Sequence, residues 1–292
     1  MSLSRVGFVL CLCLWASLGR AESELALASV AAIAVDVDTG ETLVAQNDDL
    51  VLPIASLTKV MTALVVVESG EDLDAYLEIA DWDREMAKNA YSRIRLTSQA
   101  RRKDLMRIAL MSSENRAAYN LGVHHPGGLD AFVAAMNAKA SDLGMRHTHF
   151  ADPTGLAVAN KATAADLALL AVAANAHPVL RDYSTTRQFT VNFRKPKYRL
   201  GYGNTNPLTG SSRWNVALTK TGYLTEAGRC LLMVSEMDGR TVGVALLNSL
   251  GTRSPLGDAG RIRRFLQSGD RGRVAPAASE HRNRVLNELG GG

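Results

Sequence analysis

Cysteine is scarce in this sequence. Three of the 292 residues are cysteines, and two of them, Cys11 and Cys13, lie in an apolar N-terminal stretch. If that stretch is removed, Cys230 alone remains and no internal disulfide can form. Cys230 opens the apolar segment 230–234, which predicts a buried strand thiol rather than a reactive one.

Three further absences exclude whole classes of function. Outside the N-terminal stretch, no uninterrupted apolar run approaches the roughly 20 residues that a transmembrane helix needs. No glycine-rich phosphate loop follows a predicted strand, so nucleotide binding has no support. Acidic residues are frequent between positions 68 and 85, but they lack the tight spacing of metal ligands and indicate a solvated face. We expect no metal, no cofactor and no transmembrane segment in the mature chain.

The charge balance is nearly even. The chain has 33 basic and 29 acidic residues, a formal net charge of +4. Without residues 1–21, which contain two arginines and no acid, the surplus falls to two positive charges. A surplus this small gives no basic face, so nucleic acid is not an expected partner.

The N-terminus has the pattern of a secretory signal peptide. Arg5 precedes the apolar segment 6–18, and small residues lie just before Glu22. That segment is too short to span a bilayer comfortably, which favours a cleaved leader at residues 1–21. We therefore predict an exported, periplasmic protein.

The rest of the chain predicts strands, then helices, then strands again. A hairpin is expected over 31–45, and helices over 104–111, 115–123, 129–143 and 163–176. Strands are expected over 214–222, 229–237 and 241–249, with a closing helix over 258–267. We expect one catalytic domain over 22–267, in which both chain ends build a sheet and a helical insert spans about 56–180. The polar tail at 268–292 is expected to be loosely ordered.

One short stretch carries the first chemical signal. Pro53 cannot lie inside the apolar helix that follows it, so Ser56 is expected on the first helical turn. Lys59 is three residues further on and shares its face. A hydroxyl beside an amine at a helix N-terminus is the layout of an activated serine nucleophile. Taken alone, however, S-x-x-K is a weak motif, because serine is a common helix N-cap and a lysine one turn later is ordinary.

Two more signals follow in order. Ser113-Glu114-Asn115 lies at a break between two predicted helices, and Lys220-Thr221-Gly222 ends a predicted strand. The patterns S-x-x-K, S-x-N and K-T-G each occur once in the chain, and the ordered trio is far more specific than any member.

With these three motifs the chain resembles the superfamily of penicillin-binding proteins and serine β-lactamases, and most closely its low-molecular-weight D,D-peptidases. The resemblance covers about residues 25–267. The segments that are similar to the family's motifs are 54–59, 111–118, 152–156 and 218–222. The amino-acid sequences of 112–118 and 204–206 are most similar to those of the D-alanyl-D-alanine endopeptidases, which cut peptide cross-links in cell-wall peptidoglycan. The resemblance implies an α/β (α+β) fold, an antiparallel sheet flanked by helices with a helical lobe.

Physical chemistry assigns the base. A free lysine has a pKa of about 10.4, so it is protonated at neutral pH and cannot accept a proton. Lys59 must therefore have a lowered pKa if it is to take the Ser56 proton. Burial would lower it, and a charged Lys220 about 5 Å away would contribute roughly 3 kcal/mol of repulsion. We hypothesise that Ser113 relays protons toward the leaving amine and that Asn115 orients Lys59 and accepts the substrate amide.

The last motif is assigned to substrate binding. Lys220 and Thr221 are expected to hold a free carboxylate, and Gly222 to let the substrate backbone lie against the strand edge. The resemblance implies an oxyanion hole from the backbone N–H groups of Ser56 and Tyr223. The expected partners are peptidoglycan peptide stems, with β-lactams as covalent inhibitors.

Three alternatives remain open. A carboxypeptidase would use the same chemistry on a different acyl donor, but the tail at 268–292 is too short for the further β domain and membrane anchor common in such enzymes. The family resemblance implies that an efficient class A β-lactamase would carry a glutamate that activates the deacylating water, and the corresponding segment 150–160 has no glutamate. Asp152, which precedes Pro153, is predicted to be a turn residue. A non-catalytic cell-wall binding module would be expected to have lost Ser56 or Lys59.

Overall fold

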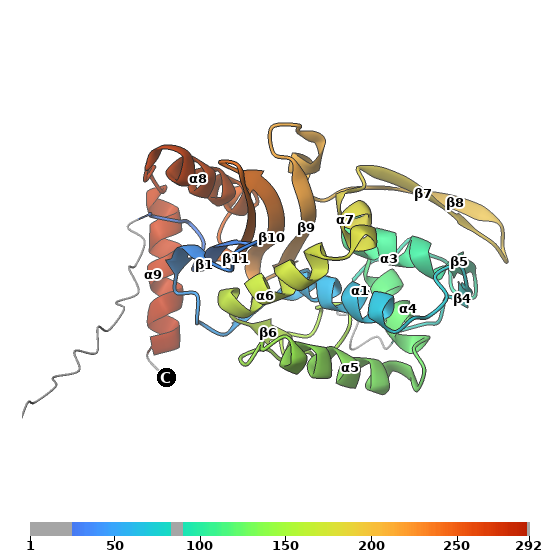
Figure 1. The fold of residues 1–292 in the computed structure, drawn as a ribbon. Coiled ribbons are helices and arrows are strands. Elements are labelled where there is room, and N and C mark those ends of the chain that lie inside the picture. Colours follow the sequence, from blue (N-terminus) through green and yellow to red (C-terminus); the bar gives the residue numbers. More distant parts are fainter. Residues whose placement is uncertain (1–24, 83–89, 291–292) are drawn as a thin grey trace, which may run out of the picture.

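The computed structural model describes residues 25–82 and 90–290 (Figure 1). The predicted signal peptide lies outside the described residues. Within them, no helix is both long and apolar enough to cross a membrane.

A five-stranded antiparallel sheet forms one side of the molecule. Its strands lie in the order β2-β1-β11-β10-β9, so the first and last parts of the chain pair with one another. The strands are β1 (Ala31–Asp36), β2 (Thr42–Gln46), β9 (Val216–Leu224), β10 (Gly228–Met237) and β11 (Arg240–Ser249). β10 and β11 join through Asp238-Gly239, both at positive φ, which matches the hairpin that the sequence predicts.

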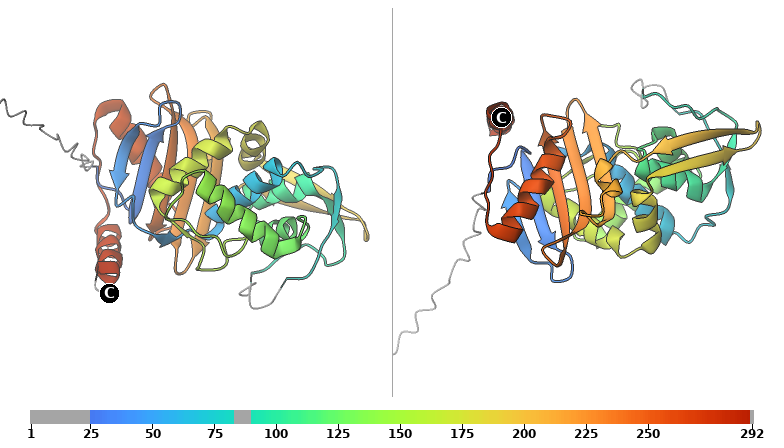
Figure 2. Two further views of the ribbon diagram at one scale, coloured as in Figure 1. Left: turned by 60° about the horizontal axis from the view of Figure 1, so that its bottom comes forward. Right: turned by 90° about the horizontal axis from the view of Figure 1, so that it is seen from above.

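Helices cover both faces of this sheet (Figure 2). One face packs against α6 (Ala164–Asn175) and the other against α8 (Ser254–Ser268). Two apolar clusters follow from this arrangement, one on each face of the sheet. Because both faces are buried, β10 and β11 are apolar along most of their length and do not alternate.

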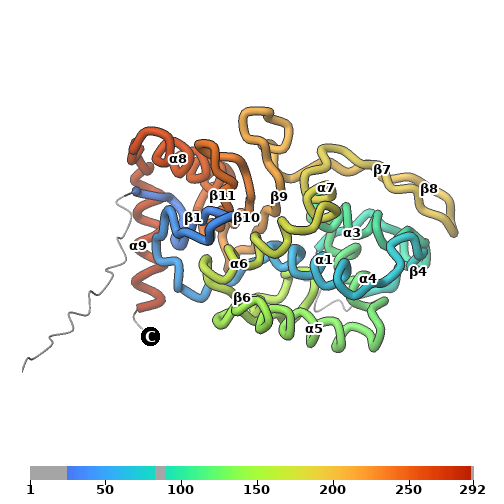
Figure 3. Tube along the Cα trace, viewed as in Figure 1, coloured from blue at the N-terminus to red at the C-terminus, as the bar shows by residue number. Residues whose placement is uncertain are grey.

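The helical lobe lies beside the free edge of β9. Its helices are α1 (Thr58–Glu68), α3 (Arg102–Met111), α4 (Asn115–Val123), α5 (Gly128–Asp142) and α7 (Pro178–Thr185). Nine of the 11 residues of α1 are buried, which makes it the central helix of this lobe. The short strands are β3 (Leu52–Pro53), β4 (Tyr76–Glu78), β5 (Gln99–Arg101) and β6 (Lys161–Ala162). The hairpin β7 (Gln188–Phe193) and β8 (Tyr198–Gly203) extends away from the sheet (Figure 3).

Two segments differ from the sequence prediction. The stretch 178–185, for which no helix was expected, forms α7, because Pro178 can occupy the first turn of a new helix as well as end the previous one. The expectation of a loosely ordered tail was wrong for most of its length, since α9 (Pro276–Gly290) is helical. Val285 and Leu286 pack against the core, and Arg282 donates to the carbonyl of Leu27 at 2.9 Å.

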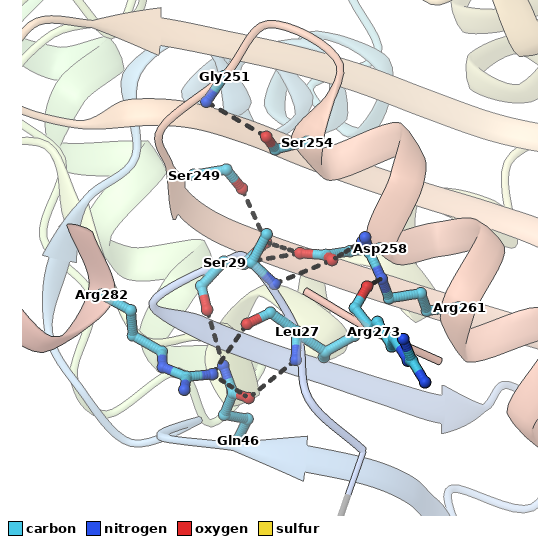
Figure 4. A network of polar contacts seen from close by, with 11 residues as sticks. Leu27, Ser29, Gln46, Ser249, Gly251, Ser254, Asp258, Arg261, Arg273 and Arg282 are labelled. Carbon is cyan, nitrogen blue, oxygen red and sulfur yellow. Dashed lines mark hydrogen bonds and ion pairs between the residues drawn. The ribbon is translucent and has the colours of Figure 1, made fainter. Parts of the chain in front are cut away.

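A buried carboxylate ties α8 to the start of the described chain (Figure 4). Asp258 is fully buried and accepts hydrogen bonds from the backbone N–H groups of Ala28 and Ser29 at 3.0 and 2.8 Å. The Ser29 hydroxyl donates to it at 2.7 Å and the Arg261 guanidinium at 2.8 Å. This network holds the segment before β1 against the sheet.

Replacement of Asp258 by alanine is expected to lower the free energy of unfolding by about 3–5 kcal/mol, because it leaves three buried donors and a largely buried guanidinium without their acceptor. Urea unfolding followed by circular dichroism measures the change. The matched control is Asp270→Ala, whose 3.5 Å ion pair with Arg264 is exposed and should contribute about 1 kcal/mol or less. Equal losses for the two variants would contradict the structural role given to Asp258.

Candidate active site

Ser56 lies in a short turn between the two lobes. The residues Ala55–Leu57 form a single 3-10 turn, and α1 begins at Thr58. Ala55 has a positive φ of 46°, and the Thr58 hydroxyl donates to its carbonyl at 2.8 Å. Ser56 therefore precedes the helix proper instead of lying on its first turn, with its side chain in the cavity beside β9.

Lys59 is wholly buried, at 0% exposure, directly behind Ser56. Its Nζ lies 2.9 Å from Ser56 Oγ, 2.7 Å from Asn115 Oδ1 and 2.5 Å from the carbonyl of Thr154. Two of these partners can only accept hydrogen bonds. A neutral amine has two N–H groups for these two acceptors, which leaves its lone pair to accept the proton of the Ser56 hydroxyl 2.9 Å away. The geometry therefore fits a lysine that accepts a proton from Ser56.

Burial sets the protonation state of Lys59. Removal from water lowers the pKa of Lys59 to about 7, against the opposing effects of the Asp152 and Glu114 carboxylates. The expectation that the charge of Lys220 contributes to this shift is not supported, because the causes of the lowered Lys59 pKa do not include Lys220. Burial, followed by repulsion from Lys59, instead lowers the pKa of Lys220. At neutral pH a large fraction of Lys59 is thus free to act as a base.

Asp152 organises the loop that holds Lys59 from the other side. Its buried carboxylate accepts hydrogen bonds from the backbone N–H groups of Thr154, Gly155 and Ala157. This is the turn that the sequence predicts for Asp152. It fixes the Thr154 carbonyl on Lys59, a contact that the sequence analysis did not identify.

The second motif connects α3 to α4. Ser113 has a positive φ of 61° and lines the same cavity as Ser56 and Asn115. Glu114 caps α4 by accepting from the backbone N–H of Ala117 at 2.5 Å. Burial raises the pKa of Glu114. The cap places Asn115 at the first residue of α4, where its side chain reaches Lys59.

The third motif lies on β9, at the edge of the sheet. Lys220 is buried, its Nζ donates to the Thr221 carbonyl at 2.8 Å, and burial followed by repulsion from Lys59 lowers its pKa. The Thr221 hydroxyl lies 2.7 Å from that of Thr205. A Cβ on Gly222 would come within 3.3 Å of the Ser56 nitrogen, so glycine lets β9 approach the turn closely.

A cavity of about 330 Å³ joins these parts. Six of the eight predicted site residues line it: Ser56, Ser113, Asn115, Thr221, Gly222 and Tyr223. Lys59 and Lys220 are buried behind its wall. The lining also includes Thr205 and Arg229, to which the sequence analysis gave no role. Thr205 lies in the segment 204–206, which is part of the family resemblance. No sequence motif indicates Arg229, because only the pairing of β10 with β9 brings it to the cavity.

Comparison with known proteins agrees with this geometry. The D-alanyl-D-alanine carboxypeptidase family matches residues 19–250. The chain belongs to this family. It is 46% identical to a D-alanyl-D-alanine endopeptidase of Pseudomonas aeruginosa over 88% of this chain and 83% of the relative. An endopeptidase of the same name from Escherichia coli is 41% identical over 91% of this chain and 86% of the relative. These matches make the chain a serine hydrolase.

Solved structures confirm the predicted fold class. The crystal structure of a Streptomyces DD-transpeptidase superposes with a TM-score of 0.76 at 28% identity, covering 82% of this chain and 98% of the other. A penicillin-binding protein of Listeria monocytogenes, in an ampicillin-bound form, gives a TM-score of 0.69 at 29% identity, covering 82% of this chain and 96% of the other. The family's fold of an antiparallel sheet with a helical lobe is therefore present here.

Proposed function

We propose that this protein is a serine D,D-peptidase that hydrolyses D-alanyl cross-links in peptidoglycan through an acyl-enzyme. The observation that carries the proposal is the buried Lys59 amine, hydrogen-bonded to Ser56 Oγ at 2.9 Å on the wall of a cavity. Relatives at 41–46% identity named as D-alanyl-D-alanine endopeptidases support the choice of bond.

The first half-reaction transfers the acyl group to Ser56. Neutral Lys59 takes the hydroxyl proton as Ser56 Oγ attacks the D-alanyl carbonyl. The backbone N–H groups of Ser56 and Tyr223 would bind the resulting oxyanion, as the family resemblance implies. When the C–N bond breaks, the proton passes from Lys59 through Ser113 to the departing amine. Water then attacks the ester, and its proton returns to Ser56.

The substrate is held along β9. This strand is the free edge of the sheet, so an extended peptide can pair with it. Thr221 would bind the free carboxylate next to the scissile bond. Lys220, whose pKa burial lowers, would regain its proton when that carboxylate arrives, because an opposite charge favours the protonated form.

The rate of acylation should depend on pH through Lys59. With a pKa of about 7, Lys59 is mostly protonated at pH 5.5 and mostly neutral at pH 8.5, so activity is lost as the pH falls. The second-order rate constant for acylation by a penicillin is expected to fall about tenfold per unit below pH 7 and to level off above it. Stopped-flow fluorescence measures this constant, and circular dichroism at each pH monitors the fold. A flat profile would exclude Lys59 as the base.

A β-lactam should acylate Ser56 and leave slowly. The Asp152 carboxylate is occupied by backbone N–H groups and the Thr154 hydroxyl, so it is not free to activate a deacylating water. Penicillins are therefore inhibitors in this proposal and poor substrates. Fast turnover of a chromogenic cephalosporin would instead favour the β-lactamase alternative.

The proposed location is the periplasm, reached through the signal peptide predicted at residues 1–21. A fusion of the full precursor to a reporter enzyme that is active only after export tests this assignment. Loss of the reporter signal when residues 1–21 are deleted is the expected result.

The function itself is tested by competition between two substrates. Purified residues 22–292 receive a cross-linked muropeptide dimer and a pentapeptide monomer together, with and without benzylpenicillin, and chromatography follows both. We expect the dimer to disappear and benzylpenicillin to block its loss. Loss of terminal D-alanine from the monomer alone would make the protein a carboxypeptidase, and loss of neither would reject the proposed activity.

A further inference from the structure

The charge of this chain is distributed unevenly along the sequence. Between Asp182 and Glu226 there are seven lysines and arginines and no acid, whereas the rest of the chain after residue 21 has 24 basic and 29 acidic residues. Four of the seven lie in the segment 194–199, at the tip of the β7–β8 hairpin: Arg194, Lys195, Lys197 and Arg199. The nearly even total charge therefore conceals a basic surface at this hairpin, which corrects the expectation of no basic face.

Three of these four cations are unpaired among the described residues. All four residues are exposed, and the hairpin that carries them extends away from the five-stranded sheet (Figure 1). Arg194 is tied to β5 through its Nε, which donates to Gln99 Oε1 at 2.8 Å. Within the described part of the chain, the side chains of Lys195, Lys197 and Arg199 make no hydrogen bond, ion pair or ring contact. Their charges are therefore free to attract an anionic partner.

A second cavity connects the hairpin with the catalytic cavity. It has a volume of about 300 Å³, and Ser113 and Asn115 line both cavities. Gly201 and Gly203 of β8 form part of its wall. Arg199 is the next residue on the same exposed face of β8, because alternate residues of a strand share a face. A polymer that enters the catalytic cavity can thus continue across the second cavity to the basic hairpin.

We propose that Lys195, Lys197 and Arg199 form a docking surface for polymeric peptidoglycan, where they bind carboxylates of peptide stems other than the stem being cleaved. This inference rests on the proposed function, because the occupant is the polymer that contains the scissile bond. Such a polymer presents many carboxylates, which complement a surface that has cations and no acid. Lysine and arginine have long, flexible side chains that can meet carboxylates at variable positions, so no fixed register is needed.

The position of the hairpin determines what docking would change. A polymer held at the hairpin keeps its stems close to Ser56, which raises their effective concentration there and lowers KM for the polymer alone. Each exposed ion pair contributes little, so the three cations together should strengthen polymer binding roughly tenfold at low salt. Because all three are exposed, this contribution should disappear as ionic strength rises.

Two triple variants test the proposal. The hairpin variant removes the three cations of the docking surface: Lys195→Gln, Lys197→Gln and Arg199→Gln. The control variant removes the same charge from exposed positions on other elements: Arg146→Gln, Lys161→Gln and Arg273→Gln. Each protein is given insoluble peptidoglycan sacculi and a soluble cross-linked dimer, at low and high salt. Sedimentation with sacculi after acylation by benzylpenicillin measures docking without the catalytic cavity, and thermal unfolding monitors the fold.

The polymer and the dimer should respond differently. For the hairpin variant at low salt, we expect roughly tenfold weaker sedimentation with sacculi and a roughly tenfold lower kcat/KM on sacculi, mainly through KM. Its kcat/KM on the dimer and its rate of acylation by benzylpenicillin should stay within about twofold of the wild type. The control variant should match the wild type in every assay.

The wild type alone provides the second half of the test, which depends on no variant. High salt, or sacculi whose carboxylates have been amidated, should weaken its sedimentation to the level of the hairpin variant. Sedimentation that neither treatment changes would overturn the proposal, as would a hairpin variant that still sediments like the wild type. An equal loss on the dimer would place the three cations in the catalytic cleft, and stronger binding to anionic phospholipid vesicles than to sacculi would assign them to a membrane; either result overturns the docking surface.

Failure of the proposed function gives a different result. A wild type that neither cleaves the dimer nor is acylated by benzylpenicillin would reject the proposed activity. Its sedimentation with native and amidated sacculi would still decide whether the basic hairpin binds peptidoglycan.

Discussion

The Ser56→Ala variant is expected to lose turnover of a cross-linked dimer by about 10⁴-fold or more, because among the described residues Ser56 has the one hydroxyl that is hydrogen-bonded to Lys59. Covalent labelling by a penicillin should vanish with it. The fold should persist, since within the described part of the chain the Ser56 side chain makes one hydrogen bond, to Lys59, whose amine keeps Asn115 and the Thr154 carbonyl as partners. The loss of that bond should cost about 1 kcal/mol of unfolding free energy.

Intact-protein mass spectrometry after incubation with benzylpenicillin measures the adduct, and thermal unfolding measures the stability. The matched control is Ser212→Ala, an exposed serine outside the catalytic cavity, which should be labelled as fully as the wild type. Residual dimer cleavage by Ser56→Ala at near the wild-type rate would mean that a different group is the nucleophile. Loss of folding in Ser56→Ala would show that Ser56 is structural.

The parts of the site that depend on local sequence were predictable. Ser56 and Lys59 are three residues apart, a spacing that brings their side chains together in any helical turn. The motif Lys220-Thr221-Gly222 follows an apolar run typical of a strand, and the hairpin at Asp238-Gly239 follows from its turn residues. The family resemblance supplied the common cavity, which no spacing along the chain indicates.

The parts that depend on distant contacts were not predictable. The Thr154 carbonyl reaches Lys59 across 95 positions of sequence, and the neutral Lys59 geometry depends on it. Arg229 meets Tyr223 only through the register of β9 with β10. Burial, and not the charge of Lys220, lowers the pKa of Lys59, because the side chain is completely enclosed by elements from both lobes.

The helix α9 was also not predictable from the sequence, because it too depends on distant contacts. Its sequence is polar and carries few apolar residues, which favoured a loosely ordered tail. Its stability comes instead from tertiary contacts at separate points: Arg282 on the Leu27 carbonyl, and His281 Nε2 at 2.8 Å from Asn248 Oδ1. Helices of this length in proteins depend more on packing than on propensity, so composition was a poor guide.

The largest structural effect is expected from Gly155→Ala, in the loop that Asp152 organises. Gly155 has a φ of +80°, and a Cβ there would lie 2.0 Å from the Ala55 carbonyl oxygen and 2.9 Å from the Ser56 nitrogen. Both atoms are backbone and cannot swing aside, so the loop and the Ser56 turn must separate. We expect a loss of about 3 kcal/mol or more in the free energy of unfolding, from the clash and the strained φ together.

The same separation should disable the nucleophile. If the loop retreats, the Thr154 carbonyl leaves Lys59 and the Ser56 turn shifts, and a displacement of about 1 Å can reduce catalysis about 100-fold. Gly144→Ala is the matched control, because Gly144 has a φ of +75° but no atom within 4 Å of its Cβ position. That variant carries the backbone strain alone and should be acylated at the wild-type rate. If Gly155→Ala were as stable and as reactive as Gly144→Ala, the close approach of the two loops could not be what positions Ser56.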